Sequence, residues 1–214
     1  MYEKYLNNSE ISKIIDAINE MHRGSIVSCH GRGHAMRVVA AAEQILVGLN
    51  FDARTVEMGK IAALLHDIGN IAGRRKHAKK SAALAKIFLS REDFLRRERD
   101  AIVQAIVDHS EGKKISSAIG AALIIADKID ISRRRIFPLS EPDVLHKNLL
   151  ELEDVTLSIS EKIISINYIG TKKFSKELLM REYKKGFILP MLAAEFLGCE
   201  WRILFNGSRG HELA

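Results

Sequence analysis

Apolar residues recur at helical spacing through the first two thirds of the chain. In residues 9–21 the isoleucines fall on one face behind a candidate Ser9 cap, which is typical of an amphipathic helix. The same periodicity appears in residues 34–49, between Asp52 and His66, and in residues 76–89, 98–109 and 116–131. The pattern predicts six helices joined by short polar connections, and the sixth, rich in alanine and isoleucine, is predicted to be central.

The pattern changes after residues 138–142, where two prolines lie close together. Apolar positions alternate in residues 155–159 and again in residues 164–168, and a Ser-Glu-Lys string separates the two runs. Alternation on both sides of a short polar turn predicts a β-hairpin. The chain is therefore expected to change from helices to strands at this point.

A further helix and a further strand are predicted beyond the hairpin. The helix begins near Ser175, is interrupted at Pro190 and ends at Gly198, because proline breaks helices and glycine ends them. Residues 201–205 can add a third strand. The predicted fold class is mainly α, with a helical bundle over residues 1–137 and a small C-terminal α+β appendage of ββαβ order over residues 138–214.

Composition and charge describe a folded globular chain with a basic balance. Apolar residues make up 47% of the sequence and charged residues 28%, which excludes a disordered chain. No window resembles a membrane span and the first residues lack the layout of a signal peptide, so we expect a cytoplasmic location and no membrane partner. The net charge of +6 and the pI near 9.3 favour polyanionic partners without choosing between nucleic acid and nucleotides.

Six side chains with metal-binding chemistry lie at the ends of predicted helices or inside the most apolar of them. We call them the polar cluster: His34, His66, Asp67, His77, His109 and Asp127. In an antiparallel bundle, alternate helix starts and ends meet at the same pole of the fold. The sequence therefore predicts that these side chains converge on one point.

Single members of the polar cluster have ordinary explanations. Taken alone, His34 and His77 are more often capping or solvated residues, and His109 is a favourable cation at a helix C-terminus. Asp127 is harder to explain, because it lies in one of the most apolar stretches, and Asp67 also follows an apolar run. A buried carboxylate needs a cation or several hydrogen-bond donors to stay charged. Two such carboxylates favour a shared cation.

The order of residues in the polar cluster resembles a known signature. His34, the His66–Asp67 pair and Asp127 are similar to the H…HD…D signature of the HD superfamily of metal-dependent phosphohydrolases. The flanking strings GHAMRVV, LLHDIGN and LIIADKID are similar to those of the family as well, and the resemblance covers residues 22–137. It implies an HD-domain helical bundle that hydrolyses a phosphoester or a phosphoanhydride.

The resemblance also implies a set of metal ligands. The four residues of the signature would hold a first cation, and His77 and His109 fall where two-metal members bind a second, with Asp67 as the bridge. His66 and Asp67 are then the expected catalytic residues, beside a metal-activated water. Imidazole and carboxylate donors favour one or two divalent transition-metal ions, Fe, Mn, Co, Ni or Zn, over Mg, which prefers oxygen.

Basic residues flank the polar cluster in the sequence. The four candidates for binding substrate are Arg37, Arg74, Arg75 and Lys128. The opposing interpretation is a solvated charged face, and Lys128 can equally neutralise the carboxylate beside it. His30 is more simply a loop residue than one that supports the ligands or faces the substrate, and His22 has no assigned role.

Three classes of function remain open from the sequence. The leading hypothesis is a metal-dependent phosphohydrolase that acts on a nucleotide or another small phosphorylated molecule. A nucleic-acid-directed phosphodiesterase or binder is less favoured, because aromatic residues are only 6% and do not interleave with the basic clusters. A non-catalytic nucleotide sensor would not need the full ligand set. The appendage can serve as a dimer interface, a lid or a specificity element, which leaves homo-oligomerisation open.

Overall fold

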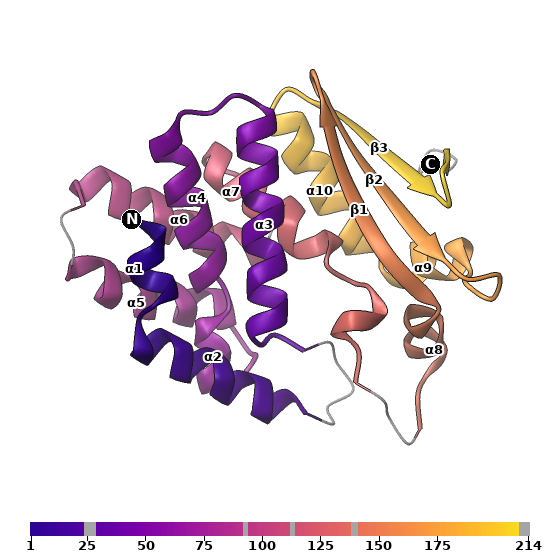
Figure 1. Ribbon diagram of the computed structural model, residues 1–214, viewed down its shortest axis with the longest axis horizontal. Helices are drawn as coiled ribbons and strands as arrows, with labels where there is room; N and C mark the ends of the chain where they lie inside the picture. The colour runs from indigo at the N-terminus through magenta and orange to yellow at the C-terminus, as the bar shows by residue number, and fades with distance from the viewer. Residues whose placement is uncertain (24–28, 92–93, 112–113, 138–140, 210–214) are drawn as a thin grey trace.

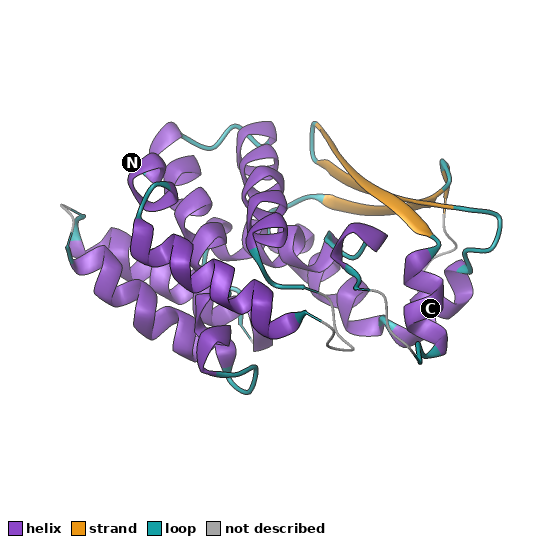
Figure 2. Cartoon of the chain, turned by 60° about the horizontal axis from the view of Figure 1, so that its bottom comes forward, coloured by secondary structure: helices purple, strands orange, loops and turns teal. Residues whose placement is uncertain are grey.

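The computed structural model describes residues 1–23, 29–91, 94–111, 114–137 and 141–209 of the 214-residue chain. Helices fill one side of the molecule, and a twisted sheet accompanied by further helices lies along the other (Figure 1). Figure 2, turned by 60°, shows the strands confined to one end of the molecule. Among the described residues, no helix combines the length and the apolar character needed to cross a membrane.

The N-terminal part is helical, as predicted. Its elements are α1 (Tyr2–Leu6), α2 (Ser9–His22), α3 (Arg32–Gly48), α4 (Ala53–Leu65), the 3-10 helix η1 (Ile68–Ala72), α5 (His77–Ser90), α6 (Arg96–Glu111) and α7 (Ala118–Ile129). The six predicted helices are α2 to α7, and the structure adds α1, which is too short to show helical periodicity. Side-chain caps fix several of the helix starts. Asp52 accepts a hydrogen bond from the Thr55 amide at 2.9 Å as expected, whereas the cap of α2 is Asn8 instead of Ser9.

The C-terminal part has the predicted ββαβ order with small additions. Its elements are η2 (Arg133–Arg135), α8 (Val144–Leu150), β1 (Leu152–Ser160), β2 (Ile163–Gly170), α9 (Lys176–Glu182), α10 (Lys184–Phe196), β3 (Glu200–Phe205) and β4 (Ser208–Arg209). The described strands form one sheet in the order β1-β2-β3-β4. The hairpin of β1 and β2 is antiparallel, β3 is parallel to β2, and β4 returns antiparallel to β3.

The prediction that Pro190 interrupts the C-terminal helix is wrong. The break lies at Tyr183, between α9 and α10, and Pro190 is inside α10. An interior proline removes one helical hydrogen bond and costs about 3 kcal/mol. Phe187 and Ala194 are fully buried on either side of it. Their burial keeps the helix continuous through the proline.

Helix α7 lies at the centre of the fold, as predicted, and is buried along nearly its whole length. One apolar cluster packs Leu123 of α7 with residues of α4 and α6, and a second packs Ile125 of α7 with Ile45 of α3 and Ile164 of β2. The appendage therefore shares a core with the bundle. The domain division at residues 137 and 138 stays a prediction.

Close packing between η1 and α5 generates the first testable prediction. A Cβ added at Gly69 would lie 2.3 Å from the Ser81 nitrogen and 2.5 Å from the His77 carbonyl oxygen. Both are backbone atoms, which cannot rotate away as a side chain can. We expect Gly69→Ala to lower the free energy of unfolding by roughly 1–3 kcal/mol, measured by chemical denaturation.

Gly120→Ala is the matched control for this change. A Cβ there would meet only ordinary contacts, the nearest being the Ser117 hydroxyl at 3.4 Å. Alanine is also favoured over glycine inside a helix by up to about 1 kcal/mol. We expect the control to match or exceed the stability of the original chain. Equal stability of Gly69→Ala and Gly120→Ala would contradict the packing argument.

Candidate metal centre

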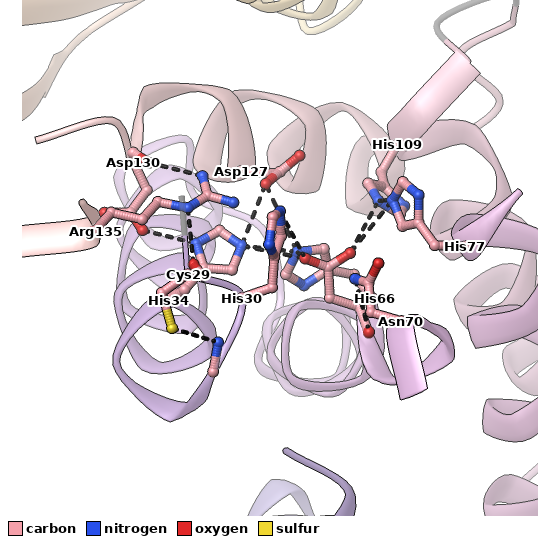
Figure 3. A network of polar contacts seen from close by, with 12 residues as sticks. Cys29, His30, His34, His66, Asn70, His77, His109, Asp127, Asp130 and Arg135 are labelled. Carbon is pink, nitrogen blue, oxygen red and sulfur yellow. Dashed lines mark hydrogen bonds and ion pairs between the residues drawn. The ribbon is translucent and has the colours of Figure 1, made fainter. Parts of the chain in front are cut away.

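The polar cluster comes together at one pole of the bundle, as Figure 3 shows for its labelled histidines and Asp127. Five helices, α3 to α7, supply it. Five of its residues lie in the first turn, in the last turn or at the C-cap of one of these helices, and Asp67 directly follows the C-cap of α4. His34, His66, Asp67, His109 and Asp127 are buried, and His77 is partly exposed. The predicted convergence is therefore what the structure shows.

Four donor atoms of the cluster face a first common point. The Nε2 atoms of His34 and His66 are 3.1 Å apart, and they lie 3.5 Å and 3.3 Å from Oδ2 of Asp67. Oδ1 of Asp127 is 3.4 Å from His34 Nε2 and 3.7 Å from His66 Nε2. Separations of this size between donor atoms suit a single ion bound at about 2 Å from each.

The second carboxylate oxygen of Asp67 faces a second group of donors. Oδ1 lies 3.3 Å from Nε2 of His77 and 3.9 Å from Nε2 of His109, and those two nitrogens are 3.2 Å apart. Oδ1 is buried and has no hydrogen-bond partner among the described residues. A buried carboxylate oxygen without a donor is costly, and a cation would satisfy it. The residues present therefore fit two ions with Asp67 between them.

The four histidine rings of the cluster are held in the orientation that metal binding requires. Backbone carbonyl oxygens lie near Nδ1 in three of them: Ala63 at 2.7 Å for His66, Ile106 at 2.6 Å for His109 and Arg74 at 3.2 Å for His77. A carbonyl oxygen can only accept, so each Nδ1 carries the proton. When such a ring is neutral, its Nε2 is left with a lone pair directed into the cluster.

Comparison with known proteins agrees with this geometry. The family model for the HD domain matches residues 31–161. The chain belongs to the HD domain family. At the level of the superfamily the chain is a metal-dependent phosphohydrolase. HD domains bind divalent metal ions, and the described residues include His/Asp groups able to hold one.

A predicted HD superfamily hydrolase from an uncultured Thermotogales bacterium is similar in structure, with 27% sequence identity and a TM-score of 0.47. The similarity covers 57% of this chain and 67% of that protein. No curated protein matches the sequence.

Asp130, which the sequence reasoning missed, supports the polar cluster through His34. Oδ2 of Asp130 accepts a hydrogen bond from Nδ1 of His34 at 2.7 Å, so that His34 also directs its Nε2 inward. Arg37 donates to both oxygens of Asp130, at 2.6 Å and 3.1 Å, and Arg135 donates to its backbone oxygen at 2.8 Å. Burial opposes the charge of Asp130, but the hydrogen bonds from His34 and Arg37 outweigh it and hold its pKa well below the usual range. The signal in the sequence was a third carboxylate beside the apolar run of α7.

The four predicted substrate-binding residues divide into two pairs. Arg37 is engaged with Asp130, and Nζ of Lys128 lies 2.5 Å from Oδ2 of Asp127, so both balance buried carboxylates. Arg74 and Arg75 are exposed in the turn before α5. Contact between any of the four and a substrate stays a prediction.

His30 lies closer to the centre than its interpretation as a loop residue suggests. It precedes α3, yet its Nε2 is 3.9 Å from Oδ2 of Asp67 and its Nδ1 is 3.2 Å from Nδ1 of His22. His22, which had no assigned role, is buried in the last turn of α2. The sequence offered no signal for this pair, because the residues between His22 and His30 show no helical or strand periodicity.

Charge in the metal-free cluster is balanced by protonation of His66. Burial lowers the basicity of this imidazole, but the carboxylates of Asp67 and Asp127 outweigh burial and raise its pKa to about 10. His109, buried in the same way and repelled by the charge on His66, has its pKa lowered to about 3. His66 must therefore lose a proton when a cation binds. The pKa of His34 in the same group is also raised, because burial, which lowers it, is outweighed by hydrogen bonds to Asp127, Asp130 and Asp67.

This proton predicts how metal affinity depends on pH. Because the folded pKa of His66 is about 10, cation binding displaces a proton at any pH below that value, and the affinity rises with pH. With at least the His66 proton released, we expect Mn²⁺ to bind at least about 100-fold more tightly at pH 8.5 than at pH 6.5. Calorimetric titration in two buffers of different ionisation enthalpy measures the proton directly. Equal affinity at both pH values would contradict the assignment.

Asp130 gives a second prediction for the centre. Asp130→Ala removes the acceptor for His34 Nδ1 and leaves Arg37 unpaired, so we expect metal affinity to fall roughly 10- to 100-fold. Asp130→Asn keeps an acceptor oxygen and should lose less. Competition with a chromophoric chelator measures both.

Asp108→Asn is the buried carboxylate control for Asp130. Asp108 accepts hydrogen bonds from Gln104 and Ser116 and none from a histidine of the cluster. We expect its replacement to leave metal affinity unchanged. If Asp130→Ala bound metal as tightly as this control does, Asp130 would have no part in orienting His34.

Proposed function

We propose that this HD domain hydrolyses a phosphoester or phosphoanhydride bond of a small phosphorylated molecule, with nucleotides as the first class to test. The observation that carries the proposal is the position of Asp67. Its two oxygens face two separate groups of imidazoles, and one of these oxygens has no hydrogen-bond partner in the described part of the chain. A carboxylate that bridges two cations is the arrangement that fits both facts.

Each group of the centre has a distinct proposed task. His34, His66, Asp67 and Asp127 would hold one ion, and Asp67, His77 and His109 would hold the other. Bound cations supply positive charge for a phosphoryl oxygen and lower the pKa of a water to near neutrality. His66 and Asp67 are the proposed catalytic residues, because they place a nitrogen and an oxygen next to the reacting atoms. The imidazoles would bind the cations as neutral ligands, which would leave the centre with a net positive charge toward a phosphate.

The residues around the centre have supporting tasks in this proposal. Lys128 and Arg37 neutralise Asp127 and Asp130, so these carboxylates do not repel an incoming phosphate. Arg74 and Arg75 lie exposed beside His77 and are the proposed first contacts of the substrate. Guanidinium groups at such a rim favour phosphates through paired hydrogen bonds.

Replacement of Asp67 tests the proposed function. Asp67→Ala removes the ligand shared by both groups, so we expect bound metal and hydrolysis to be lost together. Elemental analysis measures the metal, and a panel of nucleotides, dinucleotides, cyclic dinucleotides and short oligonucleotides measures hydrolysis. Asp100→Ala is the control, because Asp100 is exposed on α6 and pairs only loosely with Arg96 at 3.8 Å. Hydrolysis by Asp67→Ala at the rate of the control would refute the assigned centre.

His77→Ala tests the second ion independently of the first. We expect this change to reduce bound metal from about two equivalents to about one, because it removes a ligand of the second group alone. If the original chain held one equivalent and His77→Ala were fully active, the second ion would be withdrawn and the first would stand.

A further inference from the structure

Three pairs of imidazoles face each other nitrogen to nitrogen at this pole. The separations are 3.1 Å for His34 and His66, 3.2 Å for His77 and His109, and 3.2 Å for His22 and His30. The first two pairs belong to the two groups of metal ligands. The third pair joins none of the three-residue groups whose donor atoms lie within 4.8 Å of one another in the described chain. His22 and His30 therefore need a different explanation.

The hydrogen bond between the two rings fixes which nitrogen of His30 carries the proton. One Nδ1 must donate to the other, because two lone pairs repel. If His30 donated, its Nε2 would turn a lone pair toward Oδ2 of Asp67, 3.9 Å away. If His22 donates, a neutral His30 carries its proton on Nε2 and turns an N–H toward the centre. The second arrangement is the favourable one.

The backbone that carries His30 is held from two sides. On one side the Cys29 thiol lies 2.8 Å from Oδ1 of Asn19 in α2, and a Cβ added at Gly31 would lie only 2.4 Å from the same oxygen. On the other side Cys29 and Arg135 exchange two hydrogen bonds, at 2.8 Å and 3.0 Å. Figure 3 shows His30 beside His34, and the centroids of the two rings are 5.6 Å apart. The ring is thus held in place before any ligand arrives.

The distance to Asp67 decides what His30 contacts. At 3.9 Å its Nε2 is too far from Oδ2 for a hydrogen bond. His109 lies at the same distance from Oδ1, but His109 belongs to two groups of donor atoms within 4.8 Å of one another, and His30 belongs to none of those found among the described residues. A donor at this place lies next to a group bound at the first cation, not next to the cation itself. We propose that His30 donates a hydrogen bond from Nε2 to a phosphate oxygen of the substrate, and that His22 positions it. This inference rests on the proposed hydrolysis of a phosphorylated molecule.

Nearby charge is consistent with a phosphate at this place. Burial first, and then the positive charges of Arg74 and Arg135, lower the pKa of both imidazoles against the opposing charge of Asp67. A neutral N–H donor on His30 among guanidinium groups suits an anion better than a further cation. This charge comes from two arginines that are distant in the sequence. Arg74 is exposed before α5, and Arg135 is buried beside Cys29.

Inorganic phosphate binding to the Mn²⁺-loaded protein tests the inference. We expect His30→Leu to weaken phosphate roughly 10- to 100-fold, the worth of a hydrogen bond to a charged group, while elemental analysis finds unchanged metal. His30→Gln places an amide near the position of Nε2 and should retain most of the affinity, whereas His30→Asn places it near Nδ1 and should not. His22→Leu should weaken phosphate, and His22→Asn, with an amide near Nδ1, should restore it. With a substrate in hand, KM should rise more than kcat falls.

Each alternative outcome has one meaning. Loss of a metal equivalent in His30→Leu would make His30 a ligand, and unchanged phosphate affinity would leave it no role; both overturn the inference. Equal affinities for His30→Gln and His30→Asn would show that Nε2 is not the donor, even if His30→Leu failed to fold. If the original metal-loaded protein bound no phosphate and hydrolysed nothing in the panel, the proposed function itself would fail. A protein that hydrolyses substrate while His30 is dispensable refutes the inference about His30 alone.

Discussion

The buried carboxylate of Asp67, placed between two groups of imidazoles, is the constraint on which the rest of the structure depends. It is almost fully removed from water at the point where α4 ends and η1 begins. An isolated charge in such a place is too costly for a chain of this size to keep. Without metal, a proton on His66 balances it; with metal, the cations do. The ends of five helices must therefore stay together around this one charge balance.

The helices and the polar cluster could be predicted because their signals are local. Apolar spacing marks α2 to α7 directly, and the carboxylates of Asp67 and Asp127 stand out against the apolar runs that precede them. The partners of the cluster could not be predicted in this way. Asp130 and His34 are 96 positions apart, and the link between them is a single hydrogen bond that leaves no periodic trace. His22 ends α2 and His30 precedes α3 eight positions later, so no periodicity in the sequence marks their contact.

Errors in the predicted fold have the same physical origin. Pro190 is a strong local signal for a helix break, but burial of the flanking side chains of α10 outweighs it. The cap of α2 moved by one residue because Asn8 and Ser9 are both good caps, and the Asn8 side chain reaches two amides. Packing across the molecule can outweigh local conformational preferences of about 1 kcal/mol or more. A single stretch of sequence does not show that packing.

The C-terminal appendage packs against helices that carry residues of the metal centre. Its sheet shares an apolar core with α3 and α7, the helices that carry His34 and Asp127. The Tyr183 hydroxyl donates to the backbone oxygen of Lys128 at 3.1 Å, directly beside Asp127. A small cavity of about 180 Å³ between β1 and these two helices is lined by Arg37 and Asp130, together with Val155 and Leu157 of the sheet. The sheet and the Arg37–Asp130 pair therefore line the same cavity, and Asp130 in turn holds His34. The appendage thus forms part of the surroundings of the metal centre, although none of the cluster residues belongs to it.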